Sequence, residues 1–150
     1  MRKRSLLTRI LILVLVFAMV CPYVSAAEQA SYYLSSYNAY MYAASNGRVR
    51  AYFDVEGTDY MDEIGALQVK MYESDDDDPD GDWTRVATYN YEDYTGMLAY
   101  NDDYHSSYVS YNGTIGKYYQ AYVTIWAGKD GDGDARYYWT DIVQASRYAQ

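Results

Sequence analysis

The chain has 150 residues, 21 of them acidic and 12 basic, for a formal net charge of −9, and it contains 22 tyrosines and one cysteine. This length suits one domain with a modest core. A single cysteine excludes a disulfide within the chain, and the negative charge disfavours nucleic acid and anionic membrane surfaces because phosphates would repel it.

The first 26 residues have the organisation of a secretory signal peptide. Four basic residues lie among the first nine, and residues 10–20 form an uncharged apolar run. The run is shorter than the roughly 20 residues of a membrane span. Val24-Ser25-Ala26 then places small residues where a signal peptidase cleaves. We expect a signal-peptide helix over residues 1–26, cleaved after Ala26 or Ala27, and a secreted domain over 27–150; an uncleaved N-terminal anchor is the alternative.

The predicted exported part is strongly acidic and has no cysteine. Cys21 follows bulky Met19 and Val20 inside the predicted signal peptide, so we interpret it as part of the removed segment and not as a lipidation site. Residues 27–150 keep all 21 acidic residues but only eight of the basic ones, which gives a net charge of −13. Such a charge favours solubility, cations and basic partners.

Alternation of apolar and polar residues with a period of two runs through most of residues 31–142. The clearest case is residues 48–56, where Val49, Ala51, Phe53 and Val55 share one side. This pattern is typical of a half-buried strand, and no segment has a sustained helical period beyond a possible single turn at residues 61–64. Further inward rows are predicted at Leu67, Val69 and Met71 and at Ala121, Val123, Ile125 and Ala127. The expected strands are 31–43, 48–56, 67–72, 83–91, 107–111, 118–127 and 135–142.

Turn residues separate these segments. Asn46-Gly47 is a strong hairpin signal, and further turns are expected at 75–82, Asn112-Gly113 and 129–133. Seven short strands at this spacing predict a single antiparallel β-sandwich domain of immunoglobulin or fibronectin type III character, with a small β-barrel as the alternative. Tyr119 is a candidate tyrosine corner at the start of its strand.

Catalytic chemistry has little support in the sequence. His105 is the only histidine, and no glycine-flanked serine forms a nucleophile elbow. The acidic residues cluster in solvated turns such as Asp75–Asp78, where a carboxylic acid is hard to keep protonated for glycoside hydrolysis. We therefore predict a protein that is not an enzyme.

A calcium site is a competing interpretation of the loop at residues 129–133. Asp130, Asp132 and Asp134 have the one-three-five ligand spacing of an EF-hand loop, and Asp141 falls at position twelve. Ala135 replaces the required glycine, however, and the flanks read as strands. A polar hairpin loop is favoured over weak calcium binding, and no other cofactor is expected. The acidic loop 75–82 is a second, looser candidate, favoured as a charged loop that keeps a sheet edge soluble.

Exposed aromatic residues are the best candidate for binding. Tyr118, Tyr122 and Trp126 should share the outward side of one strand, extended on the next strand by Tyr138 and Thr140 or by Tyr137 and Trp139. Such a row can stack sugar rings or anchor a protein partner. The competing interpretations are cross-strand packing that only stabilises the sheet, and burial of this side in the core.

Three short stretches, Met61–Ala66, Gly96–Asn101 and Ile125–Lys129, resemble a family of small secreted proteins of unknown function from Gram-positive, mainly clostridial, bacteria. The resemblance extends over most of residues 27–150. It implies export and a compact β-domain, and it implies no activity, cofactor or site.

Taken together, the sequence predicts a secreted, non-enzymatic interaction module at or near the cell envelope that binds an extracellular glycan or protein through a Tyr/Trp strand face. The alternatives are a hydrolase of an extracellular polymer and a calcium-stabilised structural or antimicrobial-type secreted protein. The ligand, the oligomeric state and retention at the wall have no signal in the sequence.

Overall fold

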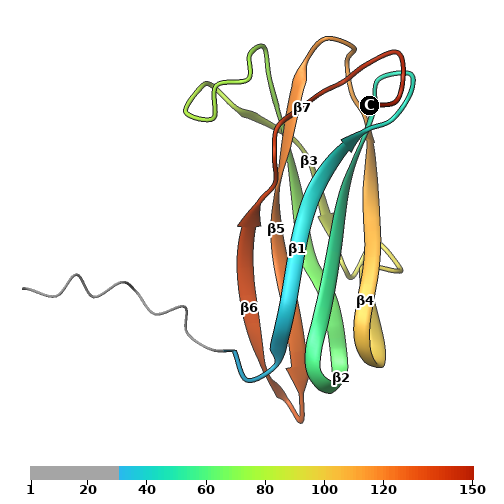
Figure 1. The fold of residues 1–150 in the computed structure, drawn as a ribbon, viewed down its shortest axis with the longest axis vertical. Helices are drawn as coiled ribbons and strands as arrows, with labels where there is room; N and C mark the ends of the chain where they lie inside the picture. The colour runs from blue at the N-terminus through green and yellow to red at the C-terminus, as the bar shows by residue number, and fades with distance from the viewer. Residues whose placement is uncertain (1–30) are drawn as a thin grey trace, which may run out of the picture. The chain divides into compact units, whose positions relative to one another are not determined.

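The computed structural model describes residues 31–150, so the predicted signal peptide, Cys21 and the cleavage positions after Ala26 and Ala27 lie outside the described residues. Residues 31–150 form an all-β fold, an antiparallel sheet of seven strands (Figure 1). None of these residues forms a helix of the length and apolarity needed to cross a bilayer. The strands are β1 (Leu34–Ala43), β2 (Arg48–Ser74), β3 (Thr84–Asn90), β4 (Leu98–Asn112), β5 (Tyr118–Lys129), β6 (Asp132–Trp139) and β7 (Val143–Gln144).

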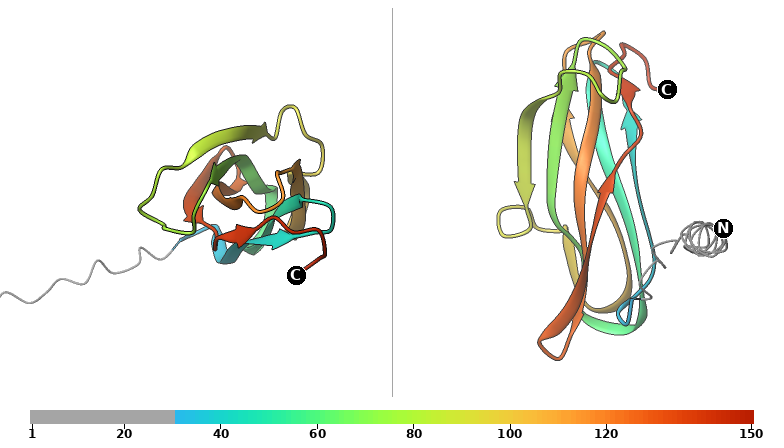
Figure 2. Two further views of the ribbon diagram at one scale, coloured as in Figure 1. Left: turned by 90° about the horizontal axis from the view of Figure 1, so that it is seen from above. Right: turned by 90° about the vertical axis from the view of Figure 1, so that its left-hand side faces the viewer.

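The long strand β2 organises the sheet. Its first part pairs with β1 and β4. Residues 61–65 still pair with β4, and the last part pairs with β5 and β3. β6 and β7 add to β5. The register between β2 and β4 shifts between Glu56 and Met61, and both strands turn back there (Figure 1). Seen from above, the strands therefore surround a closed interior (Figure 2).

Two half-sheets result from this curling. The first half-sheet contains β1, residues 48–56 of β2 and residues 104–112 of β4, and the second contains residues 61–74 of β2 with β3, β5 and β6. Each has one side turned to the interior and one side turned to solvent, because successive side chains in a strand alternate.

The interior is filled by the predicted inward rows. Val49, Ala51, Phe53 and Val55 are fully buried, and so are all four inward residues of β5, which confirms both alternation patterns. Burial of a Val, Ile or Phe side chain stabilises a fold by about 1.5–3 kcal/mol. Since no disulfide is possible among residues 31–150, packing and hydrogen bonds between strands hold this fold together.

Several expected boundaries are wrong, although the number of strands is right. Residues 48–56 and 67–72 belong to one strand, and residues 61–64 are strand instead of a helical turn. The expected last strand, 135–142, divides into β6 and β7. Leu67 is half-buried and not inward, because the register with β5 shifts between Ala66 and Gln68 and Ala66 takes the inward place.

Gly65 is required beside this bulge. Its φ is +144°, and a Cβ at this position would lie 2.2 Å from the carbonyl oxygen of Met97. The same carbonyl accepts a hydrogen bond from the Ala66 N–H at 2.9 Å. Only glycine allows β2 and the segment before β4 to approach so closely.

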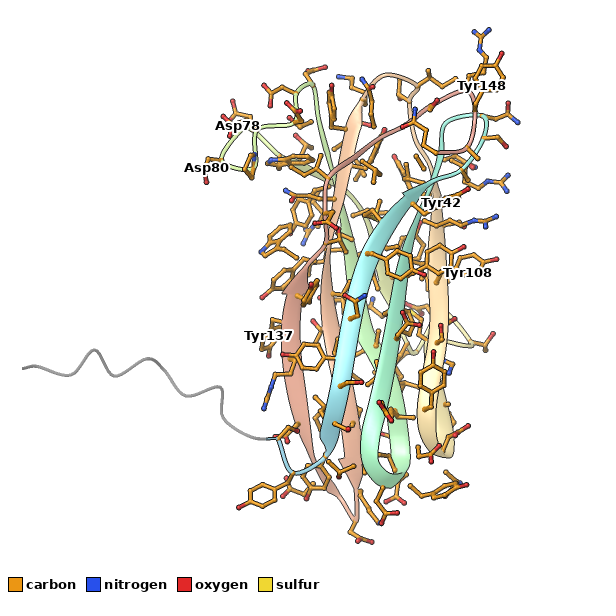
Figure 3. The ribbon with its side chains drawn as sticks, viewed as in Figure 1. Tyr42, Asp78, Asp80, Tyr108, Tyr137 and Tyr148 are labelled. Atoms are coloured by element: carbon orange, nitrogen blue, oxygen red, sulfur yellow. The ribbon has the colours of Figure 1, made fainter. Side chains whose placement is uncertain are left out.

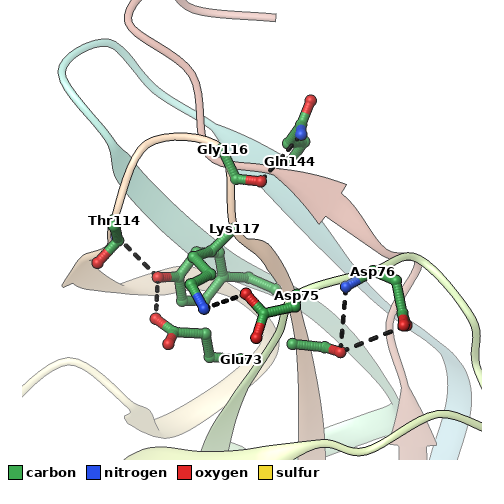
Figure 4. A network of polar contacts seen from close by, with 9 residues as sticks. Glu73, Asp75, Asp76, Thr114, Gly116, Lys117 and Gln144 are labelled. Atoms are coloured by element: carbon green, nitrogen blue, oxygen red, sulfur yellow. Dashed lines mark hydrogen bonds and ion pairs between the residues drawn. The ribbon is translucent and has the colours of Figure 1, made fainter.

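Tyr119 lies where the connection between β4 and β5 meets the end of β2 (Figure 4). Its side chain is fully buried, and its hydroxyl accepts the Thr114 N–H at 2.8 Å and donates to Glu73. Burial, followed by the hydrogen bond to the Glu73 carboxylate, raises the pKa of Tyr119 to about 12. The phenol thus fastens the connection between β4 and β5 to the end of β2, with the upstream backbone contact of the tyrosine corner predicted for this residue.

Candidate functional site

Four aromatic side chains form a continuous cluster on the outer side of the second half-sheet. The ring centroids of Tyr122 and Trp139 are 4.8 Å apart, and those of Tyr72 and Trp139 are 5.2 Å apart. Tyr137 stacks on Tyr122 at 6.0 Å with an interplanar angle of 10°. Tyr137 and Trp139 remain 65% and 49% exposed, so a ligand can reach the cluster. We call Tyr72, Tyr122, Tyr137 and Trp139 the aromatic ridge.

A two-residue turn sets the register that builds the ridge. Asp130 and Gly131 both have positive φ, 56° and 82°, and Lys129 pairs with Asp132 across the turn. Asp-Gly is a preferred sequence for such hairpin turns. Counting back from it places Tyr122 opposite Trp139. The turn chemistry therefore decides which aromatic residues of β6 lie beside those of β5.

The first of two hollows lies at one end of the ridge. It has a volume of about 570 Å³ and is lined by Tyr72, Trp83, Gln120 and Trp139, together with Pro79 and residues 140–142. The indole N–H of Trp83 donates to the Asp78 carbonyl at 2.9 Å, which ties this ring to the loop at residues 75–83. Aromatic walls and a buried amide therefore face the same space.

The second hollow has a volume of about 410 Å³ and lies beside Tyr122 and Tyr137. Its polar groups include Lys70, Gln68 and Asn90. The Gln68 amide donates to Asn90 at 2.7 Å, which fixes the two amides relative to each other. Both hollows fall in the size range of small-ligand sites, about 300–1,000 Å³.

The carboxylates near the ridge are not arranged for hydrolysis. Asp141 lines the first hollow and Glu92 the second, so neither hollow beside the ridge is lined by two carboxylates; Asp62, Glu63 and Asp132 line a third hollow, away from the ridge. Glycoside hydrolysis needs two carboxyl groups within about 5–9.5 Å on either side of one bond. The arrangement instead offers flat apolar rings with amide donors and acceptors around them, which suits binding.

The structure brings only one of the predicted binding residues, Tyr122, into the ridge. Tyr118 lies further along β5, opposite Ser74 and Gln144. The expectation that Tyr138 extends the outer face is corrected: Tyr138 packs against the core, edge-on to Tyr37 at 6.4 Å. Its neighbours in sequence, Tyr137 and Trp139, take the outer positions, which was the alternative.

Trp126 lies on the same strand but belongs to a different hollow. Its ring covers the backbone of Gly128 and Gly133, where an added Cβ would come within 2.8 Å and 2.6 Å of the indole. It lines a hollow of about 480 Å³ with Tyr100 and Lys129. Trp126 therefore packs on the hairpin between β5 and β6 and makes no ring contact with the ridge.

The three aspartates of the calcium interpretation have separate partners. Asp134 accepts hydrogen bonds from the Ser31 hydroxyl and the Tyr32 N–H, Asp132 accepts from the Tyr33 hydroxyl, and the Asp130 N–H donates to Asp62. Among residues 31–150 no group of three or more His, Cys, Asp or Glu side chains could hold a metal ion. The calcium interpretation of this loop therefore does not fit the structure.

The other two chemical candidates also make local contacts. The His105 Nε2 lies 2.8 Å from the Gly96 carbonyl, a backbone partner of the kind expected. In the acidic loop, the Asp78 and Asp80 N–H groups donate to Asp76 and Asp78, as in the turns that aspartate favours. Figure 3 shows Asp78 and Asp80 on a loop that projects from the sheet.

Sequence reasoning did not assign Tyr72 and Trp83 to the site. The alternation places Tyr72 on the outward side of its strand. Its position opposite Gln120 becomes visible only once β2 and β5 are placed side by side. Trp83 reaches the ridge through the fold of the loop before β3, for which the sequence has no periodic signal.

Comparison with protein-family profiles, curated proteins and solved structures finds no match to this chain. The resemblance to small secreted clostridial proteins therefore stays a prediction.

Proposed function

We propose that this protein is a secreted, non-enzymatic module that binds an extracellular glycan along the aromatic ridge. The signal-peptide pattern of residues 1–26 supports export, and the charge of −13 on residues 27–150 supports a partner other than nucleic acid or an anionic membrane. The same charge keeps an exported domain soluble.

The observation that carries the proposal is the ridge between two hollows. A sugar ring has an apolar face of C–H groups and a rim of hydroxyls. The exposed rings of Tyr137 and Trp139 can stack the apolar face, and the amides of Gln68, Asn90 and Gln120 can bond the hydroxyls in the hollows. Hollows on either side of a narrow ridge suit an extended oligosaccharide better than a broad protein surface.

The finer architecture that we propose is an immunoglobulin- or fibronectin-III-like sandwich of the two half-sheets. Two observations support it: the pairing of a long β2 with strands on both sides, and the hydrogen bond from the Thr114 N–H to the Tyr119 hydroxyl five residues later. In sandwiches of this kind, an outer sheet face is a stable platform for a ligand.

The test is binding of residues 27–150 to a panel of soluble cell-wall and plant polysaccharides by affinity electrophoresis, followed by calorimetry with oligosaccharides of the best one. Trp139→Ala should weaken binding at least about tenfold, because a central exposed aromatic anchor contributes about 1–2 kcal/mol or more. Tyr60→Ala is the matched control, since Tyr60 is 62% exposed and lies outside the ridge.

The proposal fails if wild-type protein binds none of the panel, or if Trp139→Ala and Tyr60→Ala bind equally well. An increase of reducing ends on incubation with the bound glycan would instead point to the hydrolase.

A further inference from the structure

The outer side of the first half-sheet carries a second, flat set of aromatic and charged side chains. The registers of β1 and β4 with β2 arrange these side chains in five rows across the three strands, with the middle row composed of tyrosine alone. We call this set the tyrosine grid. Its rows are Ser36–Glu56–Tyr104, Asn38–Asp54–Ser106, Tyr40–Tyr52–Tyr108, Tyr42–Arg50–Ser110 and Arg48–Asn112.

Charge runs along the grid in one direction. Glu56 and Asp54 lie on one side of the tyrosine row, and Arg50 and Arg48 lie on the other. Eight basic residues in all accompany 21 acidic ones after residue 26, so two adjacent arginines on one face are a marked local concentration.

These four charges have no oppositely charged partner within the described part of the chain. Glu56 accepts from Ser36 at 2.9 Å, and Asp54 accepts from Ser106. Arg50 lies 4.9 Å from the centre of the Tyr108 ring, and its Nε is buried without a hydrogen-bond acceptor. The ion pairs Lys117–Asp75 and Lys129–Asp59 lie elsewhere.

The middle row is a continuous aromatic platform. Tyr40 and Tyr52 stack at 5.1 Å with an interplanar angle of 3°, and Tyr52 and Tyr108 lie 5.0 Å apart with a tilt of 39°. Tyr40 and Tyr108 are 38% and 47% exposed. Exposed tyrosines of this kind supply contact area at a low cost in side-chain entropy.

We propose that the tyrosine grid is the interface of a symmetric homodimer of this chain. A two-fold axis along the tyrosine row would place a second copy face to face with the first and reverse its strand direction. Tyr52 then meets its own copy, Asp54 meets Arg50 of the second copy, and Glu56 meets Arg48. Such self-complementarity is what a two-fold interface requires, because the same surface serves both subunits.

The size of the grid predicts a weak dimer. From strand and residue spacings, the grid covers about 15 by 30 Å, or about 450 Å² per copy. Stable interfaces bury about 800 Å² per partner, so we expect reversible association in the micromolar range or weaker. The ridge and the grid belong to different half-sheets, and Figure 3 shows Tyr137 at the left of the fold and Tyr42 and Tyr108 toward its right. A dimer through the grid would therefore leave both ridges uncovered.

The test uses two charge-reversal variants of residues 27–150 in analytical ultracentrifugation, from sub-micromolar to near-millimolar concentration. R48E/R50E makes both ends of the grid acidic, and D54K/E56K makes both ends basic. Each variant alone should self-associate at least about 100-fold more weakly than wild type, because like charges then oppose each other. The equimolar mixture should associate again, as a heterodimer.

The control is R85E/R147E, which changes the net charge as much as R48E/R50E does but at exposed arginines outside the grid. It should retain most of the wild-type association. The proposal is overturned if the wild-type protein stays monomeric throughout, if two folded reversal variants fail to associate when mixed, or if the control loses association as completely as R48E/R50E. Glycan binding by Trp139 is read separately, so failure of the dimer leaves the proposed function standing.

Discussion

The aromatic ridge and the tyrosine grid are built by the same two-residue rhythm, yet they have different shapes. The grid belongs to β1, β2 and β4, and its middle row of three tyrosines lies between charges of opposite sign. The ridge belongs to β2, β5 and β6 and lies between hollows that the loops at residues 75–83 and 90–92 help to line. A tyrosine-rich strand face does not by itself indicate a ligand class; the segments around it decide whether it is a platform or a groove.

The contrast also extends to residue type. The ridge region contains two tryptophans, Trp83 and Trp139, and its polar groups are three amides, two threonines and three charged residues divided between the two hollows. The grid contains no tryptophan, and its polar groups are hydroxyls, two amides and four charges. Amides around an indole suit a neutral, hydroxyl-rich ligand, whereas a charge gradient suits a partner with the reverse gradient.

The largest expected effect comes from the core that both faces share. Phe53→Ala should lower the free energy of unfolding by about 3–5 kcal/mol, because a fully buried phenyl ring is lost. Tyr52→Ala, one residue away and on the outer side, is the matched control and should cost about 1 kcal/mol or less. Urea denaturation followed by circular dichroism measures both. Equal losses would mean that the grid is as strongly packed as the core, which would erase the distinction between outer face and interior.

The second largest effect is expected at the end of the fold where the Tyr119 side chain is buried. Tyr119→Phe should lower stability at neutral pH by about 1–3 kcal/mol, because the Thr114 N–H loses its acceptor and the Glu73 carboxylate loses its donor. The folded pKa of Tyr119, about 12, lies above its ordinary value of 10.0, so the contribution is complete below pH 10 and declines as the pH rises toward 12. The gap between wild type and variant should therefore close over this range in denaturant titrations. The hairpin turn at Asn46-Gly47 lies at the same end of the fold as Tyr119. If the difference in free energy of unfolding between wild type and Tyr119→Phe stays constant from pH 7 to 12, the raised pKa of Tyr119 is contradicted.

The smallest effect concerns the support of β6, the strand that carries Tyr137 and Trp139. Asp134 accepts hydrogen bonds from residues 31–33, and the bond from the Ser31 hydroxyl, the largest cause, lowers the pKa of this carboxyl below 3.8. A carboxyl group whose pKa is lower in the folded than in the unfolded state stabilises the fold at pH values above the unfolded pKa. This contribution is lost as the pH falls through the folded pKa.

The protection factors of the amides of residues 32–34, which compare each exchange rate with its intrinsic value at the same pH, should therefore be high at neutral pH and lower at acid pH in wild type, and low at both in Asp134→Asn. Glycan binding at neutral pH should change less than about twofold, since Asp134 lies at the hairpin end of β6 away from Trp139. A large loss of glycan binding in this variant would show that the ridge depends on the N-terminal segment.

Sequence reasoning succeeded where one local rule dominates. The alternation of Val49, Ala51, Phe53 and Val55 fixed their inward side because a strand with one wet face has no other way to bury them. Asn46-Gly47 gave the first hairpin for a similarly local reason, since both residues adopt positive φ there.

It failed where the answer depends on partner strands. The strand character of residues 61–66 comes from pairing with β4 and β5, which no short window of sequence contains. The choice between Tyr137 and Tyr138 depends on the position of one turn. The sequence predicts a five-residue turn at 129–133, whereas the structure has a two-residue turn at Asp130-Gly131, which places Tyr137 and Trp139 on the outer side. The displacement of Leu67 follows from a bulge, which adds one residue without a signal in the alternation.

The continuous β2 has a consequence for the time at which the domain can form. Ser74 pairs with Tyr118, and Arg48 pairs with Asn112, so this strand must wait for segments more than forty residues downstream before its ladders close. Topologies dominated by such distant pairings fold slowly, in about milliseconds to seconds. For the export that we propose, such slow folding would leave the newly made polypeptide extended during translocation, so that the domain would fold after crossing the membrane.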